Sequence, residues 1–235
     1  MNRRSFLERT CTASAAGLPM APLPVFAADT RPRSYARALL VDAGGQPLRA
    51  SRLKPHVNYL FHYPYAATPV FLLDLATAVA GQSLSAGGRS AVYHWPGGAG
   101  TRRSVVAYSA ICPHNLVHPN AEVSLISYRA DRARRGVQNG LIHCCGDHCQ
   151  FDPAQGAAVL AGPAHQPLAA VLLSHDRATD SLTAQATLGG ELFDEFFQKF
   201  GGQLKARNGS DWHAPASGRA RVWELSAYCR NSVQC

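Results

Sequence analysis

The chain has 235 residues, of which 46% are hydrophobic, and its formal net charge is +8. This length predicts one decorated domain or two small ones, and the apolar content excludes a disordered or collagen-like chain. The basic balance favours an acidic partner or an anionic ligand. Nucleic acid is not expected as a partner, because the chain begins with an export signal.

Residues 1–28 predict a twin-arginine signal peptide. Arg3 and Arg4 stand before Ser5-Phe6-Leu7, and the apolar stretch that follows ends at Ala27-Ala28. Glycine and proline interrupt this stretch, which makes it a poor membrane-spanning helix. We expect cleavage near its end and a periplasmic protein. The alternative is that the leader is retained as a weak membrane anchor.

Short β-rich runs dominate residues 29–190, and turn residues bound each of them. Asn139-Gly140 predicts one hairpin and Asp180-Ser181 a second. These runs predict an all-β fold, an antiparallel sandwich or barrel, with a small subdomain at about 105–165. The expected strands are 57–63, 70–75, 103–112, 122–128, 140–144, 169–174 and 181–187.

Residues 191–235 predict a different, C-terminal extension. Large apolar side chains recur there at helical spacing, and Gly201-Gly202 is expected to end the helix. We expect the helix to pack on the β body, the alternative being a helix that faces a partner. Trp223 and Tyr228 indicate a final strand.

Two short boxes carry the chemistry, Cys112-Pro113-His114 and Cys145-Gly146-Asp147-His148. Each offers one thiol and one imidazole from a tight loop. Two thiolates on one iron and two imidazoles on the other form the ligand set of a Rieske 2Fe–2S centre. The candidate ligands are therefore Cys112, His114, Cys145 and His148. Structural zinc or disulfides are the alternatives for a chain with 7 Cys, but neither explains the turn and loop residues that follow box two.

Those following residues are Phe151-Asp152-Pro153 and Gly162-Pro163, and with them the chain resembles the Rieske 2Fe–2S family over about residues 50–190. Within the family it looks most like the small subunit of arsenite oxidase, from its leader and the runs 69–75, 105–112 and 167–173. The resemblance implies a loop that covers the cluster. It also implies an electron-transfer subunit with no catalytic residue of its own. Such a subunit takes electrons from a catalytic partner, such as a molybdenum-containing oxidoreductase, and passes them to a cytochrome or copper protein.

The chain also departs from the family pattern. The quinol-oxidising type has a disulfide at the positions of Val117 and Asp147, which weakens the alternative of a cytochrome bc-type subunit. Box two is one residue short before Phe151. If the ligands are instead placed at the family's usual distance before Phe151, Cys144 becomes the thiolate ligand and Asp147 takes the position of the ligand histidine. We expect Cys145 and His148 instead, because they keep both C-x-x-H and an imidazole. The altered box keeps a third alternative open, a non-redox periplasmic protein with zinc or no metal.

Several further residues have open roles. The remaining exported cysteines are Cys144, Cys149, Cys229 and Cys235, and the tail could pair internally or with Cys144 or Cys149. His118 and His143 are expected to be surface or core histidines, with a supporting role beside the cluster as the alternative. Four basic residues lie close together between the boxes: Arg129, Arg132, Arg134 and Arg135. We expect them to form a solvated loop, the alternative being a docking patch for a partner.

Overall fold

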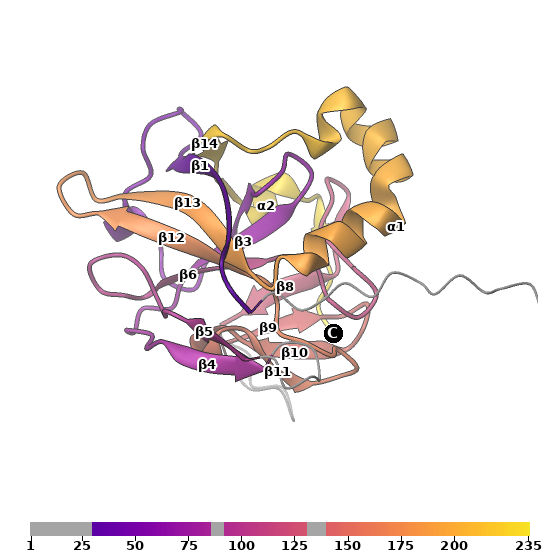
Figure 1. The fold of residues 1–235 in the computed structure, drawn as a ribbon, viewed down its shortest axis with the longest axis horizontal. Helices are drawn as coiled ribbons and strands as arrows, with labels where there is room; N and C mark the ends of the chain where they lie inside the picture. The colour runs from indigo at the N-terminus through magenta and orange to yellow at the C-terminus, as the bar shows by residue number, and fades with distance from the viewer. Residues whose placement is uncertain (1–29, 86–91, 131–139) are drawn as a thin grey trace, which may run out of the picture.

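The computed structural model describes residues 30–85, 92–130 and 140–235. The predicted leader and three of the four clustered arginines, Arg132, Arg134 and Arg135, lie outside these ranges. Within them the protein consists of one large sheet, smaller sheets beside it, and a long helix, α1 (Glu191–Asn208), on the outside (Figure 1). The described residues contain no helix long and apolar enough to cross a membrane.

The large sheet is antiparallel except where β1 and β14 run parallel. Its strands, in order across the sheet, are β14 (Gly218–Arg221), β1 (Arg33–Val41), β13 (Ser181–Leu188), β12 (Ala170–Asp176), β6 (Val105–Ser109), β3 (Pro69–Asp74), β2 (Tyr59–His62) and β15 (Trp223–Glu224). The strands β3 and β6 are buried along their whole length, and both sequences are mainly apolar, ending in the polar residues Asp74 and Ser109.

A smaller sheet beside the large one carries box two (Figure 1). Its order is β11 (Ala158–Ala161), β10 (Cys149–Asp152), β9 (Leu141–Cys144) and β8 (Ile126–Arg129). Two strand pairs flank it, β4 (Gln82–Ser85) with β5 (Val92–Trp95), and β7 (Val123–Ser124) with β16 (Asn231–Ser232). The short helical turns are η1 (Ala50–Arg52), η2 (Pro153–Gln155), η3 (Gly209–His213) and α2 (Leu225–Tyr228).

One apolar core joins the large and small sheets. Phe71 and Tyr108 of the large sheet pack in the same cluster as Ile142 and Phe151 of the small sheet, and all four are fully buried. The Tyr108 hydroxyl donates a hydrogen bond of 2.8 Å to the carbonyl of Pro153, which satisfies the only polar atom of that side chain. Burial of this phenol raises its pKa well above the ordinary value. The small sheet is therefore held by shared packing and not by its own strands alone.

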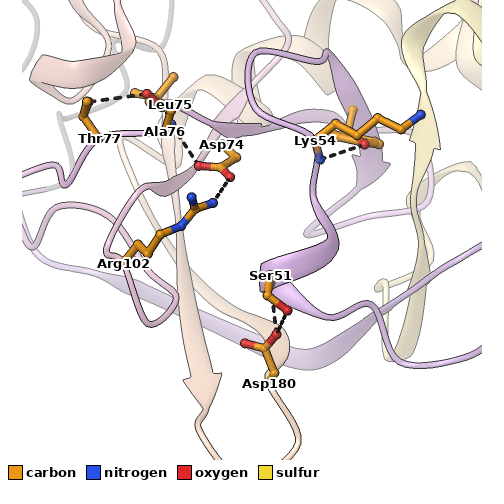
Figure 2. Close-up of polar contacts among 9 residues, drawn as sticks. Ser51, Lys54, Asp74, Leu75, Ala76, Thr77, Arg102 and Asp180 are labelled. Atoms are coloured by element: carbon orange, nitrogen blue, oxygen red, sulfur yellow. Dashed lines mark hydrogen bonds and ion pairs between the residues drawn. The ribbon is translucent and has the colours of Figure 1, made fainter.

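Two polar contacts hold loops at the edge of the large sheet (Figure 2). At the end of β3, Asp74 is fully buried and accepts a 2.6 Å bond from Arg102. At the tip of the β12–β13 hairpin, Asp180 accepts bonds from the backbone and hydroxyl of Ser51. The Ser51 bonds lower the pKa of Asp180 to about 2, with a further contribution from His175. Both carboxylates thus pair with donors from distant loops.

Helix α1 packs on the β body and on the loop after β6. Phe193 and Phe196 are fully buried, and they share a cluster with Ile111 and Leu116 of that loop. Acidic residues lie in the first turn and basic residues in the last, which suits the helix dipole. The helix runs past Gly201-Gly202, where the sequence predicted its end. A Cβ on Gly201 would lie 3.3 Å from the ring of Trp212, so the glycine lets that ring pack closely against the helix.

The predicted all-β fold with a helical C-terminal extension is confirmed. Both expected hairpins are present, β8 with β9 and β12 with β13. The C-terminal region is more broken than predicted, because β15 is followed at once by the helical turn α2. The domain boundaries at 28 and 190 stay predictions.

A cavity of about 500 Å³ lies between the end of α1, the loop at 118–122 and β2. His62 lines it and packs against the rings of Trp223 and Tyr228. Burial lowers the pKa of His62 from 6.5 to about 4, because the imidazolium would lose its hydration there. His62 is therefore neutral in the folded protein near pH 7.

We predict that truncating Phe196 to Ala lowers the free energy of unfolding by about 3–5 kcal/mol, because a fully buried ring leaves a cavity. Guanidinium denaturation of the purified chain measures the change. Lys205→Ala, an exposed change on the same helix, should alter stability by less than about 0.5 kcal/mol. Equal effects of the two changes would show that α1 is not packed as described.

We predict that His62 makes stability fall as the pH drops from 6.5 to 4. The unfolded chain binds a proton at His62 below about pH 6.5, whereas the folded chain does so only near pH 4. The loss should be at most about 3 kcal/mol. His62→Gln should remove this part of the slope when denaturation is measured at several pH values. Identical slopes for both proteins would contradict the prediction.

Candidate metal centre

Box one lies in a tight turn at the end of β6. The backbone N–H of Cys112 donates to the carbonyl of Val117 at 2.9 Å, and its carbonyl accepts from Leu116 at 2.8 Å. The N–H of Ile111 donates to the Ser109 hydroxyl at 3.1 Å. Cys112 is fully buried, whereas the His114 side chain is 36% exposed. The turn therefore directs the thiol inward and leaves the imidazole at the surface.

Box two is the four-residue turn of the β9–β10 hairpin. Cys144, the last residue of β9, pairs directly with Cys149, the first residue of β10. Residues 145–148 form the turn, in which His148 has a φ of 54°. Because side chains alternate along a strand, Cys144 shares the inward face with Ile142.

The two loops bring three buried side chains together. The thiol sulfurs of Cys112 and Cys144 and a carboxylate oxygen of Asp147 lie within 4.8 Å of one another. The sulfur of Cys144 is 3.7 Å from Oδ2 of Asp147. Nδ1 of His114 lies 3.2 Å from Oδ1 of the same carboxylate. The two thiols and the carboxylate of Asp147 thus form one cluster, and the imidazole of His114 contacts that cluster through the second oxygen of the carboxylate.

Asn115 fixes the meeting point of the imidazole and the carboxylate. Its amide nitrogen lies 2.9 Å from Nδ1 of His114 and donates a 2.8 Å bond to Oδ1 of Asp147. The ammonium of Lys199 on α1 donates to the Asn115 carbonyl at 3.0 Å. No local pattern indicated a role for Asn115, because that role depends on Asp147, which follows it by 32 positions.

Close backbone approach holds the loops together. A Cβ on Gly146 would lie 3.1 Å from the side chain of Val117, so box two packs directly on the segment that follows box one. A third loop covers box two from outside. Gly162 has a φ of 91°, and a Cβ there would lie 2.6 Å from the backbone of His148 and Cys149. This is the Gly162-Pro163 loop that the family resemblance expects over the cluster.

Hydrogen bonds determine which groups of the centre carry charge. Burial raises the pKa of Asp147, but bonds from Asn115, Cys112 and His114 outweigh it and leave the pKa below its usual range. A hydrogen bond from the Cys112 thiol lowers the pKa of Cys144, and the same bond raises that of Cys112. Asp147 is therefore a charged carboxylate near pH 7, and together with the two buried thiols it forms a set of donors suited to a cation.

The structure places the four sequence-predicted ligands differently. Cys112 and His114 belong to the group just described. Cys145 is outside it, because its sulfur forms a disulfide with Cys235, with Cα atoms 5.5 Å apart. His148 is exposed on the turn. The residues that face the centre here are Cys144, directly before box two, and Asp147 within it, which is the register obtained by counting back from Phe151.

The other cysteines and histidines also have defined places. Cys149 and Cys229 are buried free thiols, and Cys229 donates to the carbonyl of Asn120 at 2.8 Å. His118 lies on the α1 side, where its ring packs against Phe196 and Phe200. His143 is buried on β9, and burial lowers its pKa. The Cys145–Cys235 pair was not expected, because the sequence had assigned Cys145 to the metal.

No protein-family model matches the chain. Among solved structures it is similar to the soluble domain of the Rieske protein II from Sulfolobus acidocaldarius, at 21% sequence identity and a TM-score of 0.47. The match covers 65% of this chain and 78% of that one. A likeness at this level leaves the chemistry of the centre to be inferred from its own residues.

Proposed function

We propose that the chain is an exported Rieske-type electron-transfer protein. Cys112 and Cys144 would hold one iron of a 2Fe–2S cluster, and His114 and Asp147 the other. The observation that carries the proposal is the cluster of Cys112, Cys144 and Asp147, with His114 directly beside the carboxylate of Asp147. The register differs from the one predicted from sequence, and Asp147 stands where that prediction had an imidazole.

The donor set fits such a cluster. Thiolates are the usual ligands of iron–sulfur clusters, and an imidazole on the second iron is the Rieske feature. A carboxylate oxygen is a further donor that iron accepts. Cys112, Cys144 and Asp147 are buried from water, as an iron–sulfur centre requires, and the Gly162-Pro163 loop covers box two.

When bound, the cluster would supply one-electron transfer. The chain encloses the thiol side and leaves His114 partly exposed, so we propose that partners exchange electrons through the imidazole side. A carboxylate adds negative charge that a neutral imidazole lacks, so we expect a lower reduction potential than for a two-histidine centre. One titratable imidazole in place of two also reduces the coupling of potential to pH.

A single zinc ion is the second candidate. One observation favours it, which is the close spacing of the donors. All the candidate atoms of Cys112, Cys144 and Asp147 lie within 4.8 Å of one another, which suits ligands of one tetrahedral ion. Cys₂-His-Asp would then be a structural site in a non-redox protein.

The partners and the compartment are proposals that rest on the sequence resemblance. We propose as electron donor a catalytic oxidoreductase subunit such as the molybdenum-containing kind of arsenite oxidase. A cytochrome or copper protein would be the acceptor. The leader at 1–28 supports a periplasmic location.

The first test is the metal itself. We predict that the purified chain binds about two iron atoms and, after dithionite reduction, gives a rhombic EPR signal with a low average g value. Cys144→Ser should abolish the signal, whereas Cys145→Ser should keep it. Asp147→His should keep it and raise the potential. One zinc per chain with no signal would support the second candidate, and loss of signal only in Cys145→Ser would restore the ligand choice made from sequence.

The second test is the export signal. We predict that changing Arg3 and Arg4 together to Lys leaves the chain in the cytoplasm of a bacterial host, because twin-arginine translocation requires that pair. Immunoblots of periplasmic and cytoplasmic fractions measure the outcome. Arg9→Lys is the matched control and should leave export unchanged. Equal periplasmic amounts of all three proteins would contradict the proposal.

A further inference from the structure

The C-terminal segment 229–235, here called the C-terminal strap, lies beside the small sheet (Figure 1). It first follows the segment after box one. The backbone N–H groups of Arg230, Asn231 and Val233 donate to the carbonyls of Ala121, Glu122 and Ser124. Within this stretch, β16 pairs in parallel with β7. The strap is thus attached to the loop that carries Cys112 and His114.

The strap then reaches box two through a covalent bond. Cys235 forms a disulfide with Cys145, which is adjacent to Cys144 and shares its backbone. The N–H of Cys145 donates to the carbonyl of Leu125 at 2.6 Å, just beyond the strap's own pairing with β7. The strap therefore spans the junction between the two boxes, the same junction where Gly146 packs on Val117.

Arg129 braces the covalent end of the strap. Its guanidinium donates to the carbonyl of Cys235, to the carbonyl of Val233 at 3.3 Å, and to the sulfur of Cys145 at 2.9 Å. Cys235 is exposed and Cys145 half-buried, so a reductant reaches this bond without unfolding the chain. Exposed disulfides of this kind are the reducible ones.

We propose that the Cys145–Cys235 disulfide is a reducible clasp that keeps box one and box two together. Its reduction by a dithiol breaks the S–S bond, gives two thiols with two protons and two electrons from the reductant, and converts the reductant to its own disulfide. The strap then stays in place by hydrogen bonds alone. The two boxes separate more often, and the buried thiols Cys112, Cys144 and Cys149 become accessible.

The clasp itself does not depend on which metal is bound. The expectation that the clasp helps to retain a metal rests on the proposed function. The first measurement is therefore made on the metal-free full chain. Hydrogen exchange is followed by mass spectrometry with and without dithiothreitol, at the amides of Cys112, Leu116 and Cys145. These amides are hydrogen-bonded within and between the two loops.

We expect exchange at these amides to rise at least about tenfold on reduction, while exchange in the β12–β13 hairpin stays the same. The double variant with Cys145→Ser and Cys235→Ser should exchange fast with or without dithiothreitol. Arg230→Ala, which removes only the exposed ion pair with Glu122, should behave like the unchanged protein. Unchanged exchange on reduction, or an equal rise in β12–β13, would overturn the proposal.

A second measurement tests retention of metal. The chain is loaded with Zn²⁺ alone, and release to a chromogenic chelator is compared between the unchanged protein and the double serine variant. We expect release at least about tenfold faster from the variant, and equal rates would overturn the clasp. If the chain binds neither zinc nor iron, the proposed function fails, and the hydrogen-exchange result still decides whether the clasp exists.

Discussion

The register of the β9–β10 hairpin is the constraint on which the centre depends. Cys144 lies directly opposite Cys149, and the alternation of side chains puts Cys144 on the core face with Ile142. A slip by one residue would turn Cys145 inward and remove Ile142 from the core, which a buried strand resists. The neighbouring cysteine is free to bond elsewhere only because this register holds. The side chains that face the centre, the disulfide and the position of Asp147 all follow from it.

Much of the fold could be predicted from local sequence. Alternating and unbroken apolar runs indicated the strands, Gly140 with its positive φ marked the turn into β9, and phenylalanine spacing indicated α1. Box one was also visible, because C-x-H is complete within its own turn. The ligands of box two were harder to predict. The local sequence fits C-x-x-H, but the register of the buried hairpin strands decides which side chains point inward. The spacing between Phe151 and the preceding cysteines did indicate this register. We preferred the other register in the sequence analysis because it supplies a second imidazole. The partner of Cys145 lies 90 residues away, and no local pattern indicates such a contact.

The C-terminal extension is part of the centre's support and not an appended module. Lys199 holds the backbone of Asn115, whose amide bridges His114 and Asp147. Phe196 packs beneath Leu116 in the same turn. From the other end of the extension, residues 229–235 pair with β7 and bond to the turn of box two. The middle of α1 thus supports the turn of box one, and the end of the chain links box two to the segment that follows box one.

The hydrogen bond from Tyr108 to Pro153 has a consequence for anyone who would move this centre into another protein. It ties the last strand before box one to the turn after box two, inside a core that both sheets share. A hairpin of residues 141–152 cut from this chain would lose the walls that bury Ile142 and Phe151, and isolated hairpins are marginally stable at best. The donor atoms are contributed by two short loops, but their arrangement belongs to the whole domain. Transplanting the centre would require transferring β3, β6, the small sheet and the C-terminal extension as one unit.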